Sequence, residues 1–134
     1  MTDVPDQLIA RIAADSKYWL WINDQLVIFE GGLKRGPSPS GTYYDPVDIA
    51  PYLTKGSNTI AILLWHFGKD GFSHINSGKA ALLFEAIAPG LEIVSDASWQ
   101  CALYEAYQNT EAPFPNYRMP ESNIRFDARQ AITN

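Results

Sequence analysis

The sequence is poor in the residues that most often build reactive centres, with one cysteine and two histidines among its 134 residues. Cys101 alone excludes an internal disulfide and a cysteine-based zinc site. Because it lies in a run of apolar and strand-forming residues, we expect it to be buried as a small hydrophobe. His66 and His74 are eight positions apart, and the carboxylates near them do not complete a metal-ligand pattern. The sequence therefore predicts no metal and no cofactor.

Basic residues are also scarce, and long apolar runs are absent. Lys and Arg number 10 against 15 Asp and Glu, which gives a net charge of −5, and Lys34 and Arg35 form the only adjacent basic pair. Nucleic-acid binding needs a clustered basic surface, so it is not expected. The longest apolar run, residues 60–65, is far shorter than the ~20 residues of a membrane span. Residues 1–7 are acidic and polar and do not resemble a signal peptide.

Strand-forming sequence is what the chain has in abundance. Hydrophobic residues make up 46% of it, including 4 Trp, 7 Tyr and 6 Phe. A chain of this length buries roughly two-thirds of its unfolded surface, so it needs no disulfide to fold. Residues 8–14 alternate between a more apolar and a more polar face, which predicts a strand. Residues 18–22 and 26–29 are strand-like runs joined by residues 23–25 (Asn-Asp-Gln), and this pattern predicts a tight hairpin because Asn and Asp tolerate left-handed conformations.

Proline and aspartate mark the next elements. Residues 42–45 are predicted to form a strand, and Pro46 indicates a sheet edge or a bulge, because proline has no N–H to donate. Asp48 is expected to cap one helical turn over residues 48–53. Residues 59–67 follow as the strongest strand, and their apolar residues on both faces predict a central strand that is covered on both sides.

Seven or eight short strands with turn signals between them predict an all-β fold, an antiparallel β-sandwich of the jelly-roll type. All four tryptophans are expected to pack in its core. Residues 1–107 are predicted to form this sandwich. Residues 108–134 contain Pro113, Pro115 and Pro120 and are predicted to form an extended strap or linker toward a missing downstream domain. The remaining predicted strands are residues 81–87, 91–94 and 99–103.

The sequence contains no recognisable catalytic motif. A Gly-x-Ser-x-Gly nucleophile elbow is missing, and residues 31–36 (GGLKRG) lack the spacing of a phosphate-binding loop, so an inter-strand loop is the simpler interpretation. Glycoside hydrolysis needs two carboxylates at a set separation. Asp45, Asp70 and Glu85 are candidates, but the sequence does not place any two of them face to face. We therefore expect no catalytic residue, and a small stand-alone hydrolase is the less favoured alternative.

The sequence predicts two long loops, residues 31–41 and residues 68–78. The second of them combines aromatic rings with hydrogen-bonding groups. Sugars are recognised by apolar faces that stack on aromatic rings and by hydroxyls that bond to polar side chains. The sequence leaves three interpretations open: contact with a sugar, packing against a neighbouring domain, and a local structural role. The surface would be larger if the loop of residues 31–41 lay beside it. The carbohydrate-binding candidates are His66, Lys69, Asp70, Phe72, His74, Lys34, Arg35, Tyr43 and Tyr44.

Three segments resemble the galactose-binding-like jelly-roll domains of large glycoside hydrolases. Residues 12–23 are similar to the opening hairpin of those domains, with Asp24 where glycine is usual. Residues 48–61 resemble a unit of that fold in which a helical turn leads into a strand, and residues 95–99 (SDASW) resemble an element a few strands later. The resemblance implies a galactose-binding-like β-sandwich over about residues 8–103.

Residues 31–37, residues 67–74 and the tail 126–129 (FDAR) resemble N-terminal segments of bacterial α-L-rhamnosidase-like glycoside hydrolases. In that family such a tail leads into further β-sandwiches and an (α/α)₆ catalytic barrel. The resemblance implies a non-catalytic accessory domain that braces the parent enzyme, has the downstream β-sandwich and catalytic domains as partners, and adds contact with carbohydrate. An autonomous carbohydrate-binding module is the alternative. A parent enzyme of this kind would be periplasmic or extracellular.

Overall fold

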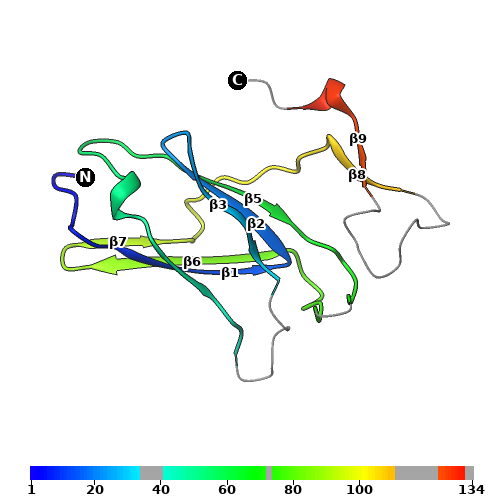
Figure 1. Cartoon of the computed structure of the whole chain (residues 1–134), viewed down its shortest axis with the longest axis horizontal. Helices are drawn as coiled ribbons and strands as arrows, with labels where there is room; N and C mark the ends of the chain where they lie inside the picture. The colour runs from blue at the N-terminus through cyan, green and yellow to red at the C-terminus, as the bar shows by residue number, and fades with distance from the viewer. Residues whose placement is uncertain (34–40, 72–73, 111–123, 132–134) are drawn as a thin grey trace. The chain divides into compact units, whose positions relative to one another are not determined.

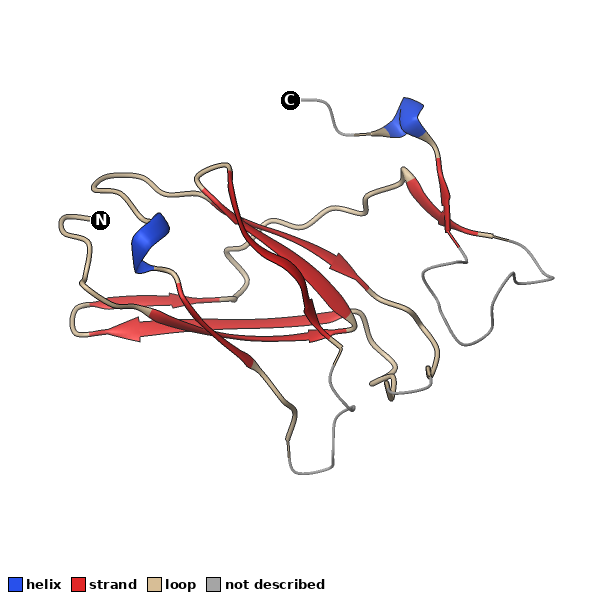
Figure 2. Ribbon diagram, viewed as in Figure 1, coloured by secondary structure: helices blue, strands red, loops and turns tan. Residues whose placement is uncertain are grey.

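The structure is a computed structural model, and it describes residues 1–33, 41–71, 74–110 and 124–131. The chain divides into two compact units, Met1–Asp96 and Ala97–Asn134. The division lies after Asp96, whereas the sequence placed the boundary of the sandwich after residue 107. Each unit is built from antiparallel strands (Figure 2).

Unit 1 contains two antiparallel sheets that lie one over the other (Figure 1). The four-stranded sheet has the order β4-β1-β6-β7, and the three-stranded sheet has the order β3-β2-β5. The prediction of an all-β fold with antiparallel sheets is confirmed, and the arrangement is consistent with a β-sandwich. The strands are β1 (Ile9–Asp15), β2 (Lys17–Ile22), β3 (Gln25–Gly32), β4 (Asp45–Asp48), β5 (Ile60–Trp65), β6 (Ala81–Ala88) and β7 (Leu91–Val94).

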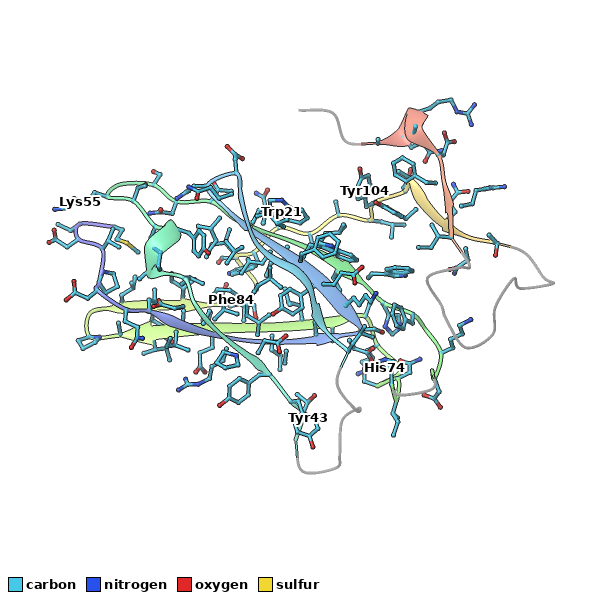
Figure 3. All side chains as sticks on the ribbon, viewed as in Figure 1. Trp21, Tyr43, Lys55, His74, Phe84 and Tyr104 are labelled. Carbon is cyan, nitrogen blue, oxygen red and sulfur yellow. The ribbon has the colours of Figure 1, made fainter. Side chains whose placement is uncertain are left out.

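The core lies between the two sheets. Alternate residues of β1 and of β2 are buried, so each strand turns one face toward the other sheet. Phe84 of β6 lies between the sheets (Figure 3), and the short 3₁₀ helix η1 (Ala50–Tyr52) closes one end. The buried apolar residues of unit 1 are Leu8, Ala10, Ile12, Tyr18, Leu20, Ile22, Ile49, Ala50, Leu53, Phe84 and Ala86.

Two local predictions are confirmed, one about a hairpin turn and one about a strand at the sheet edge. The hairpin between β2 and β3 turns at Asn23 (φ 47°) and Asp24 (φ 64°), two residue types that tolerate this left-handed region. Pro46 lies in β4, which is an edge strand, opposite Arg11 of β1. This strand begins at Asp45, however, so residues 42–44 approach the sheet without belonging to it.

Three predictions about elements are wrong. β5 is an edge strand of its sheet, not a central one. Residues 99–103 form no strand. The turn at η1 has Ile49 at its N-cap without a side-chain cap; the Oδ1 atom of Asp48 instead accepts hydrogen bonds from the backbone N–H groups of Leu8 and Ala50. Asp48 therefore ties the start of β1 to the turn.

The expected positions of the tryptophans and of the cysteine are also wrong. None of the four tryptophans belongs to the buried core of the described residues. The buried residues of β2 are those that alternate with Trp19 and Trp21, so these two rings lie on the outer face. There Trp19 stacks near Trp65 at 6.4 Å between ring centroids, which explains why β5 is apolar on both faces. Cys101 is exposed.

Unit 2 has a small ribbon of two antiparallel strands, β8 (Tyr107–Asn109) and β9 (Ile124–Phe126). The Tyr107 and Phe126 rings lie opposite each other, 4.9 Å between centroids. The 3₁₀ helix η3 (Ala128–Gln130) follows, capped by Asp127. The three prolines of the predicted strap lie outside the described residues. In the described segments the helices are short 3₁₀ turns, and none is long and apolar enough to cross a bilayer.

Candidate functional site

The end of β1 carries a buried acid. Asp15 is only 8% exposed. Its Oδ1 accepts hydrogen bonds from the hydroxyl of Ser16 (2.8 Å) and from Nε2 of His74 (3.0 Å), and its Oδ2 accepts one from the backbone N–H of Ser77 (2.6 Å). The second histidine, His66, has its Nδ1 3.3 Å from the backbone carbonyl oxygen of Asp15. We call Asp15 with Ser16, His74 and Ser77 the Asp15 clamp.

These contacts decide the charge of the acid. Burial acts to raise the pKa of Asp15, but hydrogen bonds from Ser77 and Ser16 and the charge of His74 outweigh burial and lower the pKa to about 2. Asp15 is therefore ionised at neutral pH and can only accept hydrogen bonds, so Nε2 of His74 carries the proton that it donates. The other ring nitrogen, Nδ1, is buried and has no hydrogen-bond partner within the described part of the chain.

The Asp15 clamp does not have the connectivity of a nucleophilic triad. In a triad the histidine stands between the acid and the serine and removes the serine proton. Here the acid stands in the middle: Ser16 donates to Asp15 and accepts from the backbone N–H of Phe67 (3.2 Å). Ser16 is also fully buried. Across the described ranges, His, Cys, Asp and Glu side chains form no group of three that could hold a metal ion. The hydrogen bonds from His74 and from Ser77 to Asp15 hold residues 74–77 in place.

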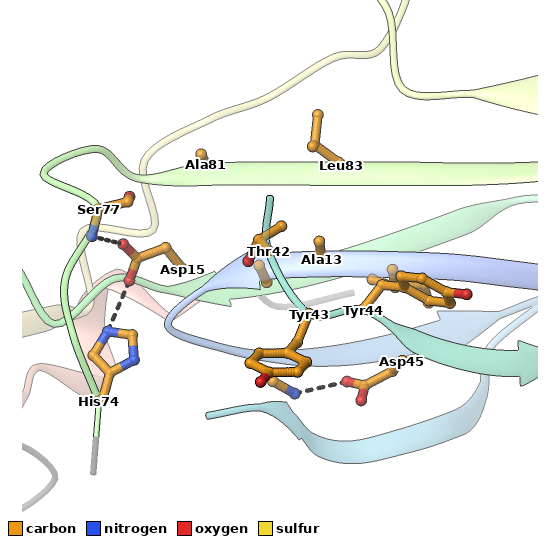
Figure 4. Close-up of a pocket in the computed structure, with 13 residues that line it drawn as sticks. Ala13, Asp15, Thr42, Tyr43, Tyr44, Asp45, His74, Ser77, Ala81 and Leu83 are labelled. Atoms are coloured by element: carbon orange, nitrogen blue, oxygen red, sulfur yellow. Dashed lines mark hydrogen bonds and ion pairs between the residues drawn. The ribbon is translucent and has the colours of Figure 1, made fainter. Parts of the chain in front are cut away.

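A groove on the outward face of the four-stranded sheet begins at this clamp, and Figure 4 shows the pocket next to the clamp. It consists of two adjoining pockets with volumes of about 140 Å³ and about 330 Å³. The smaller pocket ends at the Asp15 clamp, and the larger one extends over Arg11 and Glu85. We call the two pockets together the sheet groove. The residues that line both are Ala13, Thr42, Tyr44 and Leu83.

The hollow follows from the sizes of the side chains on β1 and β6. Ala13 lies directly opposite Leu83, and its methyl group leaves open the space beside Leu83 and Tyr44. Residues 42–44 form the other wall. Asp45 fixes the end of this wall, because its Oδ2 accepts hydrogen bonds from the Tyr18 hydroxyl (3.0 Å) and from the Gly32 N–H (2.9 Å). The apolar surface of the groove is open to solvent: Tyr43 is 63%, Tyr44 50% and Leu83 64% exposed.

The far end of the sheet groove is polar. Arg11 and Glu85 are direct cross-strand neighbours on β1 and β6, and Nη1 of Arg11 donates to Oε1 of Glu85 at 2.7 Å. Their side chains are 52% and 46% exposed. The hydrogen bond to Glu85 raises the pKa of Arg11, and the Tyr44 hydroxyl adds to this effect. The groove thus joins exposed rings to groups that can donate and accept hydrogen bonds.

The structure brings together three of the residues that the sequence nominated. Tyr43 and Tyr44 line the sheet groove together with His74, although His74 comes from a different loop than the two tyrosines. His74 contributes as a buried member of the Asp15 clamp. His66 lies on the backbone of Asp15 and lines neither pocket.

Two of the other candidates, Asp70 and Lys69, are described by the structure and do not line the groove. Oδ1 of Asp70 accepts a hydrogen bond from the backbone N–H of Asn76 (2.8 Å), so this carboxylate stabilises its own loop. Lys69 is half-buried and lines neither pocket. Phe72, Lys34 and Arg35 lie outside the described residues.

Four groove residues were missed from the sequence, namely Arg11, Ala13, Asp15 and Leu83, and Glu85 was considered only as a candidate carboxylate for hydrolysis. The more polar face predicted for residues 8–14 was a signal for Arg11, which does face outward. No local signal marks Glu85 as its partner, because their pairing depends on β1 and β6 being neighbours in the sheet. Asp15 follows Ala14 at the end of the alternating run, and nothing in the pattern indicates that it is buried.

No protein family matches the chain, and no match was found among curated proteins or among solved structures.

Proposed function

We propose that the chain is a non-catalytic accessory β-sandwich domain of a glycoside hydrolase that resembles the α-L-rhamnosidases, and that its sheet groove contacts carbohydrate. The observation that carries this proposal is the composition of the groove. Exposed tyrosine rings and Leu83 stand beside an ion pair, in a hollow on the four-stranded sheet. Apolar surface with a few fixed polar groups is the combination that binds sugars.

The surroundings of the candidate carboxylates support a non-catalytic role. A glycosidase needs one carboxyl group as a proton donor and a second across the sugar. Asp45 accepts hydrogen bonds from Tyr18 and Gly32, Asp70 accepts one from Asn76, and Glu85 pairs with Arg11. Each of these carboxylates thus has a hydrogen-bond partner in its own surroundings. Binding is the chemistry that remains for the groove.

The fold supports the galactose-binding-like jelly roll that the motifs imply. Two antiparallel sheets of four and three strands share one core, and the hairpin of the resembling segment is β2–β3. The turn and strand of residues 48–61 correspond to η1 and β5. Under the proposal, this framework holds the groove in a larger enzyme.

A bracing role is favoured by a different surface, the outer face of the three-stranded sheet. Phe29 is 70% exposed there, 6.3 Å from Trp19 between ring centroids. Leu26 is 48% exposed on the same strand. Exposed large apolar side chains of this kind mark surfaces that pack against another domain. Bracing and sugar contact use opposite faces of unit 1, so one domain can serve both.

A titration of the ¹⁵N-labelled chain, followed by NMR, tests the carbohydrate proposal. L-rhamnose, D-galactose and a rhamnosylated glycan are added in turn. We expect shifts confined to the amides of Tyr43, Tyr44 and Leu83 and their neighbours. Tyr44→Ala removes a ring worth roughly 1 kcal/mol of contact and should weaken binding about fivefold.

Phe29→Ala is the matched control, because it removes an exposed aromatic ring from the outer face of the other sheet. It should leave sugar binding unchanged. Absence of shifts in the groove with every sugar would refute the proposed carbohydrate contact. Release of 4-nitrophenol from 4-nitrophenyl α-L-rhamnoside by the chain would refute the non-catalytic role.

A further inference from the structure

The cross-strand pair of Arg11 and Glu85 deepens the proposed function, on which this inference rests. We propose that the pair recognises a vicinal diol, so that the sheet groove selects neutral sugars with two adjacent free hydroxyls over acidic sugars. The pair lies on the floor of the larger pocket and points away from the core. About half of each side chain is open to solvent.

The hydrogen-bonding capacity of the pair matches two neighbouring hydroxyls. One bond joins the two side chains, from Nη1 of Arg11 to Oε1 of Glu85. A guanidinium has five N–H donors in a fixed plane, and a carboxylate has two acceptor oxygens, so this bond and the interaction of Arg11 with the Tyr44 hydroxyl use only part of each group. One sugar hydroxyl can accept from the guanidinium while the adjacent hydroxyl donates to the carboxylate.

The walls of the groove supply the apolar half of the recognition. A sugar that bonds to the pair through its diol would place its C–H groups beside Leu83 and the ring of Tyr44, which line both pockets. The small side chain of Ala13, opposite Leu83, leaves room for the sugar ring. Polar and apolar contacts are thus available at the same time.

The charges of the residues that line the groove disfavour binding of acidic sugars. Arg11 and Glu85 neutralise each other, so the described residues on the floor of the larger pocket offer no uncompensated positive charge. The smaller pocket is lined by two further carboxylates, Asp15 and Asp45, and by the imidazole of His74. Among the described lining residues, the three carboxylates of Asp15, Asp45 and Glu85 outnumber the two basic groups of Arg11 and His74, and this excess of negative charge repels a sugar carboxylate.

Two matched pairs of ligands test the inference on the full chain by NMR titration. Methyl α-L-rhamnoside is compared with its 2,3-O-isopropylidene derivative, in which only one hydroxyl remains free. Methyl α-D-galactoside is compared with methyl α-D-galacturonate as its sodium salt. We expect the blocked sugar to bind at least about tenfold more weakly, because a site built to bond hydroxyls rejects an analogue without them. The uronate should bind several-fold more weakly than the neutral galactoside.

Glu85→Gln tests the pair directly. It keeps the size of the side chain but removes the charge, so binding of methyl α-L-rhamnoside should weaken about fivefold, and the preference for the neutral galactoside over the uronate should shrink. Asp3→Asn is the control, because Asp3 belongs to another exposed ion pair, with Lys55, outside the groove. It should change neither result. An unfolding midpoint equal to that of wild type would show that Glu85→Gln acts on binding and not on the fold.

The outcomes separate this inference from the proposed function. Equal affinity for the free and blocked rhamnosides, with shifts in the groove, would overturn the diol inference and leave carbohydrate contact standing. A uronate that binds as tightly as the neutral galactoside would overturn the selection against acidic sugars. Absence of groove shifts with every ligand would overturn both proposals.

Discussion

Asp15 offers a quantitative test of how the structure is held together, because its charge depends on the folded state. The pKa of Asp15 falls from 3.8 to about 2 in the folded chain, against the opposing effect of burial. Each pKa unit corresponds to about 1.4 kcal/mol, so the ionised acid contributes about 2 kcal/mol to the free energy of unfolding. A lowered pKa means that this contribution is complete above pH 4 and is lost as the pH falls from about 4 to about 2.

The assay is urea unfolding of wild type and of Asp15→Asn between pH 7 and pH 2. At pH 7 the variant should be less stable by about 2 kcal/mol or more, since an amide cannot accept all three hydrogen bonds of the carboxylate. Between pH 4 and pH 2 the wild type should lose about 2 kcal/mol that the variant has already lost, so the two stability curves converge. Other carboxylates titrate in both proteins and cancel in the difference.

Asp6→Asn is the matched control, because Asp6 is exposed. Its stability curve should follow that of wild type at every pH. If the Asp15→Asn and wild-type curves stayed parallel from pH 5 to pH 2, the hydrogen bonds seen at Asp15 would not be holding its charge, and the account of the Asp15 clamp would be wrong.

Three further predictions concern the fold and are measured by urea unfolding at pH 7. Gly32→Ala should destabilise the chain by more than about 2 kcal/mol, because Gly32 has a φ of +85° and a Cβ there would clash with a backbone carbonyl oxygen. Gly90→Ala is its control: Gly90 has a similar φ but open space around it, so the substitution should cost only about 1 kcal/mol. Tyr18→Phe should cost about 1.5–3 kcal/mol, since its buried hydroxyl donates to the carboxylate of Asp45. Phe84→Ala should cost about 3–5 kcal/mol, because the ring is 2% exposed between the sheets. A Phe84 variant as stable as wild type would contradict the position of the core.

The parts of the fold that the sequence predicted correctly are those with local causes. Alternation over residues 8–14 reflects a strand with one buried face, and this depends only on neighbouring positions. The turn at Asn23 and Asp24 depends on the conformational tolerance of those two side chains. Pro46 marks an edge because a proline cannot donate to a neighbouring strand on that side.

The parts that the sequence did not predict depend on which strands are neighbours. Arg11 and Glu85 are 74 positions apart, and only the register of β1 against β6 makes them a pair. The apolar outer face of β5 was interpreted as the sign of a central strand, whereas the cause is the contact between Trp65 and Trp19 of β2. From hydropathy alone, a strand face covered by a neighbouring element cannot be distinguished from one covered by the aromatic ring of an adjacent strand. The candidate site was therefore only partly predictable: its tyrosines and His74 were nominated, but the pairing of Arg11 with Glu85 on its floor was not.

The Asp15 clamp and the sheet groove belong to one structure, and this bears on how a ligand would bind. The floor of the groove is a paired ladder of β1 and β6, and residues 74–77 at its end are fixed by hydrogen bonds to Asp15 and Asp70. Little of this framework has to be ordered on binding. Tyr43 and Tyr44 are half-exposed or more, and immobilising such a side chain costs about 0.5–1.5 kcal/mol. Under the proposed function, most of the ordering cost therefore falls on the two tyrosines. Substitution of either tyrosine should therefore change the affinity for sugar more than substitutions in residues 74–77 at the end of the groove.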